Sequence, residues 1–333
     1  MCGRFSDDAV AVASLLAVAK RVLIVTHARP DGDAMGSMAA LASAARTAGK
    51  TVRTLVPGDV PDRWGFLFPD GAPAGAGEFA ALADEADLVV VVDTCAFAQL
   101  DGLSDALRTR REKIVVVDHH ATGDDIGVAR WVDPSAAAAG VMTLELIEHL
   151  GWGVSPAAAE ALLTAMTTDT GWFRFSNADG RCLRAAARLF DTGIRPDGLY
   201  ARLYQADRPE RLGLLTRALA SLRFDAGGRV ATMRLRAADF AATGARADEA
   251  ENFVNEALRV GSVEVAVLLV ETPECIRASL RSRGGVDVSA VARQFDGGGH
   301  ARAAGLRRPG DLDTLADELI DACARALGDP AGR

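Results

Sequence analysis

The chain of 333 residues lacks the features that mark secreted, membrane and zinc-cluster proteins. Its five cysteines are far apart and form no CxxC pair, which argues against a zinc cluster or dithiol redox chemistry. No apolar run reaches the roughly 18 residues of a membrane span, and residues 1–8 lack the layout of a signal peptide. We therefore expect a cytoplasmic protein with no membrane partner, whose cysteines are mostly buried thiols.

Positive charge is also scarce, because the chain has only three lysines and a net charge of −8. A protein that wraps long nucleic acid neutralises many phosphates, so this balance argues against long nucleic acid as a partner. The charge is uneven, however. Residues 277–308 contain seven arginines and two aspartates, a net charge of +5. This segment is either a solvated basic face or part of a site for a small phosphorylated ligand.

The first half of the chain alternates short β-branched runs with helical patterns. This alternation, with 49% hydrophobic residues, is typical of a parallel sheet covered by helices on both faces. The expected strands are 22–26, 51–56, 88–92 and 114–117. The expected helices are 35–48, 136–150, 156–167, 181–190 and 199–222.

The second half has a different pattern, with strands expected at 229–235, 263–270, 276–281 and 303–306, and helices at 248–259, 286–295 and 311–326. The turn residues at 225–228 favour a hairpin. We therefore predict an α/β chain: a parallel-sheet N-terminal domain (1–191), a helical linker (192–222) and a smaller mixed α/β C-terminal domain (223–333).

Polar residues follow the predicted strands of the first half, where parallel sheets bind ligands. Each of them alone could be a helix cap or a turn residue. Together they form a set of carboxylates and imidazoles: His27, Asp31 and Asp33 after the first strand, Asp93 after the third, Asp118, His119 and His120 after the fourth, and Asp169 at the end of a helix. Gly36 and Ser37 are expected to open a helix whose N–H groups suit an anion.

The carboxylate-rich set suits Mn²⁺, with Mg²⁺ as a poorer fit, rather than structural zinc. It contains too many ligands for one catalytic metal that must keep open positions. Two metals about 3.5–4 Å apart fit better, because a water between them loses its proton near neutral pH and attacks phosphorus. The residues therefore predict metal-assisted phosphoester hydrolysis.

In this order, the motifs resemble those of the DHH phosphoesterases, which are named for the triplet seen here as Asp118-His119-His120. The resemblance extends into the second half, where Arg281 within residues 279–282, then Asp287-Val288, then Gly297-Gly298-Gly299-His300 look like the associated substrate-binding domain. It covers nearly the whole chain.

The resemblance assigns roles to these residues. It implies one metal held by His27, Asp31 and Asp93, and a second held by Asp33, Asp93, His119 and Asp169, with Asp93 bridging. His120 would face the substrate phosphate and protonate the leaving oxygen, and Asp118 would orient a histidine. Arg281 and Gly297, Gly298, Gly299 and His300 would bind the phosphate or nucleoside of the substrate. The cofactors would be two divalent ions, Mn²⁺ first, with Mg²⁺ or Co²⁺ as substitutes.

The length and domain order resemble short bacterial members that act as oligoribonuclease (nanoRNase) and 3′-phosphoadenosine-5′-phosphate (pAp) phosphatase. The same branch includes enzymes for linear or cyclic dinucleotides. We expect hydrolysis of such short nucleotides to mononucleotides, and, by the same resemblance, a homodimer. The alternatives are a family II-like inorganic pyrophosphatase, a longer-groove single-strand exonuclease, and a non-catalytic nucleotide sensor. The glycine motif argues against the first, the net charge against the second and the complete ligand set against the third.

Overall fold

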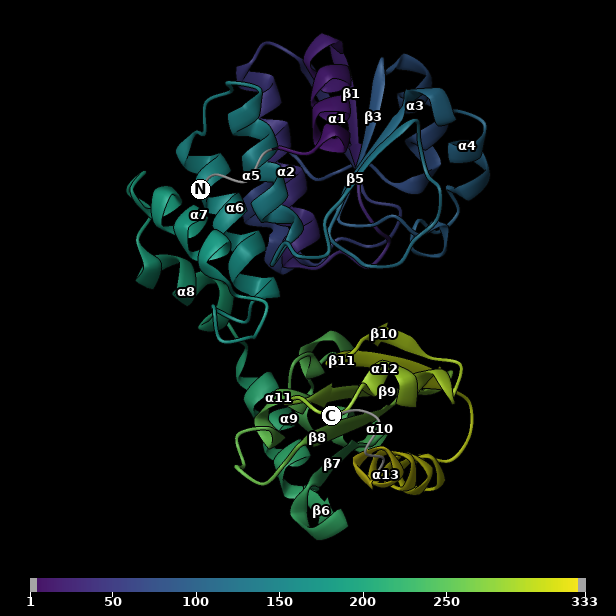
Figure 1. The fold of residues 1–333 in the computed structure, drawn as a ribbon. Coiled ribbons are helices and arrows are strands. Elements are labelled where there is room, and N and C mark those ends of the chain that lie inside the picture. Colours follow the sequence, from purple (N-terminus) through teal and green to yellow (C-terminus); the bar gives the residue numbers. More distant parts are fainter. Residues whose placement is uncertain (1–4, 329–333) are drawn as a thin grey trace. The chain divides into compact units, whose positions relative to one another are not determined.

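The computed structural model describes residues 5–328, and the chain divides between Gln205 and Ala206 into two compact units. Each unit has its own sheet and its own hydrophobic cores (Figure 1). This architecture confirms the predicted fold class. Within the described residues, no helix is long and apolar enough to span a membrane. Cys2 lies outside them, and the other four cysteines are free thiols, three of them buried.

The N-terminal unit is built on a five-stranded parallel sheet with the order β2-β1-β3-β4-β5. Its strands are β1 (Arg21–Val25), β2 (Thr51–Leu55), β3 (Leu88–Val92), β4 (Ile114–Asp118) and β5 (Ala129–Val132). Successive residues face opposite cores, as the two-residue period of a strand requires: Ile24 and Val90 face one, and Leu23 and Val89 the other. Sequence analysis missed β5, because this strand is half-exposed and has no continuous apolar run.

Helices cover both faces of this sheet (Figure 1). The larger core includes α1 (Asp7–Val18), α2 (Gly32–Thr47), α5 (Ala139–His149), α6 (Pro156–Asp169) and α7 (Gly180–Phe190). The opposite core includes α3 (Phe79–Glu85) and the region of α4 (Ser104–Arg108). Short 3₁₀ turns occur at Asp62–Leu67, Ala76–Glu78, Phe97–Gln99 and Arg111–Lys113. The sheet edge from which the loops after β1, β3 and β4 emerge is thus left for a site.

The start of α2 differs from the prediction. The helix begins at Gly32 rather than at Met35, with Asp31 as its N-cap. Gly36 therefore lies inside the helix, where a Cβ atom would come within 2.3 Å of Ala161 O on α6. The glycine allows close packing of two helices, and the expectation that Gly36 and Ser37 form an anion-binding helix N-terminus was wrong.

The helix predicted over residues 199–222 is broken in two. The structure has α8 (Pro196–Tyr204) and α9 (Pro209–Ala220), separated by residues 205–208. A proline is tolerated at the first position of a helix, where no N–H group needs a partner. The residue that precedes a proline, however, is sterically disfavoured from the helical conformation. Pro209 therefore starts a new helix, and the boundary between the units falls within this break.

The C-terminal unit contains a six-stranded mixed sheet with the order β10-β11-β9-β8-β7-β6, in which only β7 and β8 are parallel neighbours. Its strands are β6 (Arg223–Asp225), β7 (Val230–Leu235), β8 (Val265–Glu271), β9 (Ile276–Ser282), β10 (Gly298–His300) and β11 (Ala303–Arg308). The predicted hairpin at 225–228 is confirmed, because β6 and β7 pair antiparallel across Ala226–Gly228.

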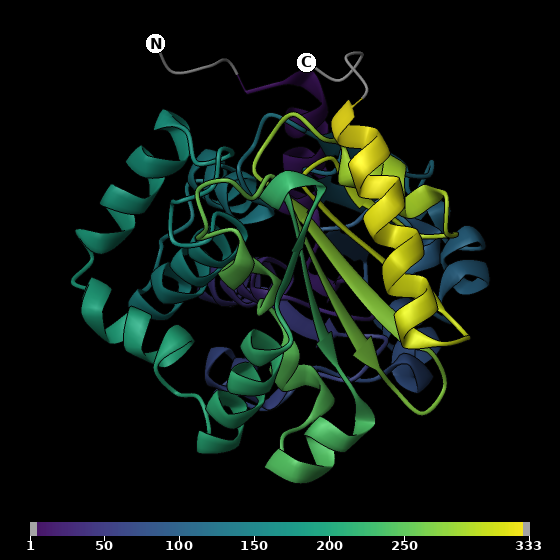
Figure 2. The same cartoon turned by 90° about the horizontal axis from the view of Figure 1, so that it is seen from below.

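Helices pack on both faces of this second sheet. Figure 2 shows α13 (Leu312–Gly328) lying along one face, in the same core as α12 (Val288–Arg293). The opposite core includes α9, α11 (Val254–Ala257) and the region of α10 (Ala237–Thr243). A single helix was predicted over 248–259, but a 3₁₀ turn (Ala247–Ala250) precedes α11 because Asn252 has φ 69°.

Candidate metal centre

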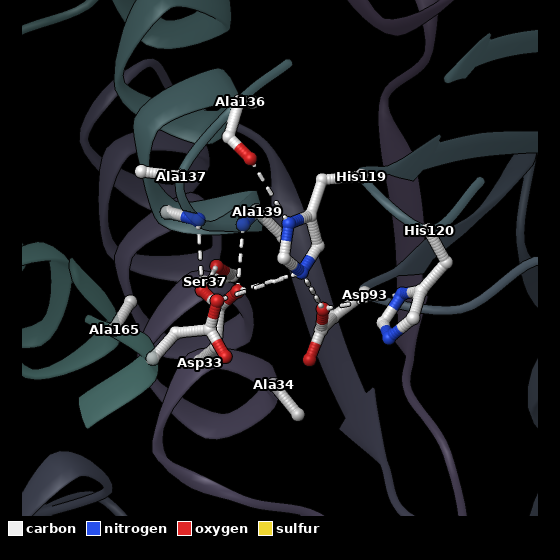
Figure 3. Close-up of polar contacts among 12 residues, drawn as sticks. Asp33, Ala34, Ser37, Asp93, His119, His120, Ala136, Ala137, Ala139 and Ala165 are labelled. Carbon is white, nitrogen blue, oxygen red and sulfur yellow. Dashed lines mark hydrogen bonds and ion pairs between the residues drawn. The ribbon is translucent and has the colours of Figure 1, made fainter. Parts of the chain in front are cut away.

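The structure brings the predicted metal ligands of the N-terminal unit together at the carboxyl edge of its sheet. Figure 3 shows three of them, Asp33, Asp93 and His119. Three overlapping groups of side chains each have ligand atoms within 4.8 Å of one another. They are His27, Asp31 and Asp93; Asp33, His119 and Asp169; and Asp93, His119 and His120. The first two groups coincide with the ligand sets that the resemblance implied, apart from the shared Asp93.

Asp93 lies between two histidines. Its Oδ2 is 3.5 Å from His27 Nε2, and its Oδ1 is 3.5 Å from His119 Nε2. The backbone adopts φ 59°, a strained conformation for a residue other than glycine. The carboxylate is 2% exposed, and Oδ1 accepts no hydrogen bond from any residue that the structure describes. A buried oxygen without a donor is costly, and a cation would satisfy it.

The ring of His119 is oriented by a backbone carbonyl. Its Nδ1 lies 3.2 Å from Ala136 O and must carry the proton, so the lone pair of Nε2 faces the carboxylates. Nε2 is 3.6 Å from Asp33 Oδ2 and 3.9 Å from Asp169 Oδ2. These distances are too long for hydrogen bonds. They are close to the about 3.0–3.5 Å that separates two ligands bonded to one metal at about 2.1 Å.

Two of the carboxylates also cap helices. Asp31 Oδ1 accepts the N–H groups of Asp33 and Ala34 at 2.9 and 3.1 Å, at the start of α2. Asp33 accepts two N–H groups at the start of α5, from Ala139 at 2.6 Å and from Gly140 at 2.9 Å. Helix N-termini stabilise negative charge, so both acids are held in fixed orientations before any metal binds.

The crowding of these acids perturbs their ionisation. Burial is the largest cause that raises the pKa of Asp93 well above its usual value, and the charges of Asp33 and Asp31 raise it further. The same three causes raise the pKa of Asp169. Burial also raises the pKa of Asp33 to about 6, opposed by His119 and reinforced by Asp31. Like charges in a buried site are costly unless a cation neutralises them. The donor set therefore fits two divalent ions.

Asp118 fixes the second histidine of the triplet rather than the first. Its Oδ1 is 2.7 Å from His120 Nδ1 and accepts the N–H of His119 at 2.8 Å. Burial alone would raise the pKa of Asp118, but the hydrogen bonds and charge of His120, together with a hydrogen bond from Cys95, outweigh it and lower the pKa. His120 Nδ1 is 4.0 Å from Asp93 Oδ1, and the residue borders a cavity of about 540 Å³ that Arg111 and Arg130 also line. This position suits proton transfer more than ligation.

Sequence analysis missed Asn177 and the segment Ala136–Gly140. Asn177 Nδ2 donates to Ala137 O at 2.9 Å, and it approaches Asp169 O at 3.2 Å and Asp169 Oδ2 at 3.4 Å. An isolated asparagine after an aromatic segment has no sequence signal for such a role. The segment acts through backbone groups, which no residue type reveals.

In the C-terminal unit, two of the predicted substrate residues, Arg281 and His300, lie on one side of the second sheet. His300 on β10 is opposite Ala303 on β11, which is in turn opposite Arg281 on β9. Directly opposite residues project to the same face. Arg281 is partly buried and Nη1 donates to Leu280 O at 3.0 Å; burial lowers the pKa of its guanidinium, against the charge of Glu251.

The glycine motif forms the start of a hairpin, in which β10 pairs with β11. A Cβ atom at Gly297 would lie 2.5 Å from Gly305 O, and one at Gly299, which has φ 137°, would lie 2.5 Å from Ala303 O. Gly298 has open space around it. Two of the three glycines are therefore required by strand pairing, which leaves Gly298 as the position where only a ligand would demand a glycine.

Comparison with known proteins places these features in a family. The model of the DHH family, N-terminal domain, matches residues 21–168, and that of the DHHA1 domain matches residues 227–326. The bifunctional oligoribonuclease and PAP phosphatase NrnA of Thermus thermophilus is 33% identical over 322 residues, covering 94% of this chain and 92% of the relative. The protein of the same name from Bacillus subtilis is 28% identical, covering 89% and 95%.

A solved structure agrees with these relatives. The exopolyphosphatase-related protein from Bacteroides fragilis superposes with a TM-score of 0.92 at 25% identity, covering 99% of this chain and all of the other. The two domain matches and the relative at 33% identity lead to one conclusion: the chain belongs to the DHH family, with a DHHA1 domain in its second half.

Proposed function

We propose that this chain is a two-metal phosphoesterase that hydrolyses short nucleotides to mononucleotides. The observation that carries the proposal is the position of Asp93, whose two buried oxygens face His27 and His119 at 3.5 Å each. A carboxylate between two imidazoles, with further acids beside each of them, is the donor set of a bridged pair of ions. The names of the relatives support the same class of reaction.

His27, Asp31 and Asp93 would hold one ion, and Asp33, Asp93, His119 and Asp169 the other, Mn²⁺ being the ion we favour. When bound, the two ions lower the pKa of the attacking water and neutralise charge at phosphorus. His120 then gives a proton to the leaving oxygen. Asp118 holds the His120 ring by Nδ1, so that Nε2 is the atom that carries the proton.

The C-terminal unit would select the substrate. Arg281 and His300 share one face of the second sheet, and a guanidinium binds a phosphate with two parallel hydrogen bonds. Burial of Arg281 weakens its hydration, which favours binding an anion over water. We propose oligoribonucleotides of a few residues, linear or cyclic dinucleotides and pAp as substrates. The inorganic pyrophosphatase alternative is not favoured, because the relatives over nearly the whole chain are named for nucleotide substrates.

A substrate panel tests this function. The metal-stripped full-length chain is supplied with Mn²⁺, Mg²⁺ or Co²⁺ and given di- to pentaribonucleotides, cyclic di-AMP, pAp and pyrophosphate at equal concentrations. We expect mononucleotides or AMP from one or more nucleotide substrates, and Mn²⁺ as the best activator. Cleavage of pyrophosphate alone, or of nothing in the panel, would overturn the proposal. Light scattering on the same preparation tests the proposed homodimer.

A further inference from the structure

The segment Ala136–Gly140, at the start of α5, contacts several of the proposed metal ligands through its backbone. Ala136 O faces His119 Nδ1, and the N–H groups of Ala139 and Gly140 bind the carboxylate of Asp33 (Figure 3). Both ligands belong to the group that also contains Asp169. The segment is thus a common support for one of the two metal positions.

Asn177 connects the remaining ligand to this support. Its Nδ2 donates to Ala137 O at 2.9 Å and reaches Asp169 O at 3.2 Å and Asp169 Oδ2 at 3.4 Å. Two of these acceptors are carbonyl oxygens, which fixes the amide with its NH₂ group toward them. Asn177 therefore attaches both the backbone and the carboxylate of Asp169 to the segment that orients Asp33 and His119.

A strained turn brings Asn177 into this position. Gly171, Trp172 and Phe173 have φ values of 55°, 60° and 61°, three successive left-handed residues. Two of them have side chains that disfavour this conformation. Trp172 packs edge-on against Tyr200, with ring centroids 5.0 Å apart, and against Tyr204 at 5.9 Å. Strain of this kind persists where the surroundings impose it, and it clusters at functional sites.

The other metal position is supported by a different segment, because Asp31 caps α2. Among the residues that the structure describes, no hydrogen bond from Ala136–Gly140 or from Asn177 reaches His27, Asp31 or Asp93. We infer that Asn177 is a positioning residue that sets the affinity of one metal only, the one held by Asp33, His119 and Asp169. This inference rests on the proposed two-metal function and specifies which half of the centre depends on the turn.

Two variants separate donation of hydrogen bonds from packing. Asn177→Ala removes the side chain beyond Cβ, whereas Asn177→Leu keeps its branched shape with a larger volume but has no donor. Asn255→Ala is the matched control, because Asn255 lies on α11 in the other unit, and among the described residues its side-chain amide donates to Asn252 Oδ1 at 3.4 Å and to no metal ligand. Each metal-stripped full-length protein is titrated with Mn²⁺ by calorimetry, and free Mn²⁺ is followed by electron paramagnetic resonance.

We expect wild type and Asn255→Ala to bind two Mn²⁺ per chain. In both Asn177 variants one site should weaken by roughly 10- to 100-fold, the usual effect of losing a residue that orients a ligand, and the other should keep its affinity. The Mn²⁺ concentration for half-maximal activity should rise by the same factor, with kcat restored at saturating Mn²⁺.

Two wild-type-like sites in Asn177→Leu would overturn the inference, and so would equal weakening of both sites, which would make Asn177 a general anchor of the fold. If the wild type itself binds fewer than two Mn²⁺, the proposed function fails instead. A near-ultraviolet circular dichroism spectrum matching wild type shows that the variant is folded, and the leucine variant retains the packing if the alanine variant does not fold.

Discussion

His120 Nδ1 lies 2.7 Å from Asp118 Oδ1, and this contact leaves Nε2 as the only ring nitrogen that can serve the substrate. The carboxylate of Asp118 is fully buried and its pKa is lowered, so it is ionised at neutral pH.

Asp118→Asn should therefore lower kcat by about 10- to 100-fold, because an amide stabilises the charged ring less well and favours the wrong tautomer. Mn²⁺ binding should change little, since Asp118 does not belong to the ligand groups. Steady-state kinetics with Mn²⁺ titration measures both quantities, and Asp101→Asn, on the surface, serves as control. Unchanged kcat would remove Asp118 from the mechanism.

Asp93→Ala and His119→Ala should each abolish Mn²⁺-dependent hydrolysis, at least 10³-fold, while circular dichroism shows the fold intact. The matched control is His149→Ala, because His149 is exposed and stacks on Phe5 at the far end of α5. Activity within a few-fold of wild type in Asp93→Ala would sink the assignment of a bridged pair of metals.

Arg281→Ala should mainly raise KM, by roughly 10-fold or more, because the guanidinium binds the substrate and takes no part in the metal centre. Mn²⁺ affinity should be that of wild type. Arg259→Ala controls for loss of a positive charge from the same unit, since its side chain is 80% exposed. An unchanged KM for every cleaved nucleotide would reject the role of Arg281.

The two glycines Gly298 and Gly299 should behave differently. Gly299→Ala should destabilise the C-terminal unit by about 1–3 kcal/mol, because a Cβ atom meets Ala303 O and φ is 137°. Gly298→Ala should leave the melting temperature unchanged and raise KM, because the added methyl group meets only the ligand. Thermal melts and kinetics test the pair, and a normal KM in Gly298→Ala would mean that the motif serves the hairpin alone.

The stabilisation that Mn²⁺ gives should increase with pH. The pKa of Asp33 is raised from 3.8 to about 6, and the pKa values of Asp93 and Asp169 are raised well above their usual value. Because these carboxyl groups have raised pKa values in the folded state, the free energy of unfolding of the metal-free protein decreases as the pH rises through those pKa values. At lower pH, Mn²⁺ must displace protons from the same carboxyl groups in order to bind. The difference in melting temperature with and without Mn²⁺ should grow from pH 4 to pH 7. A constant difference would contradict the clustering of ionised acids.

Much of this structure follows from the sequence, for reasons that particular residues illustrate. The run Leu88–Val92 is buried on both faces, so its apolar pattern was clear, and His27, Asp93 and His119 follow strands whose ends must converge. Residues 129–132 form a strand only because β4 lies beside them, and no local pattern predicts it.

The parts that sequence analysis missed depend on backbone groups and on contacts between distant segments. A glycine is required at position 36 because α6 approaches closely, and at position 297 because β11 does. Asn177 acquires its role only when a left-handed turn returns the chain to Asp169. Tertiary contacts of this kind cannot be read from residue type or periodicity.

The double contact of Asp33 with the start of α5 has a practical consequence for capturing a substrate complex. Replacing Asp33 would leave the N–H groups of Ala139 and Gly140 without their carboxylate acceptor and disturb the segment that also orients His119. The trapped geometry would then not be that of the working enzyme. The ring of His120 is held by Asp118 on β4, through Nδ1 at 2.7 Å. A substitution at His120 is therefore the better inactive form for crystallography with an intact nucleotide.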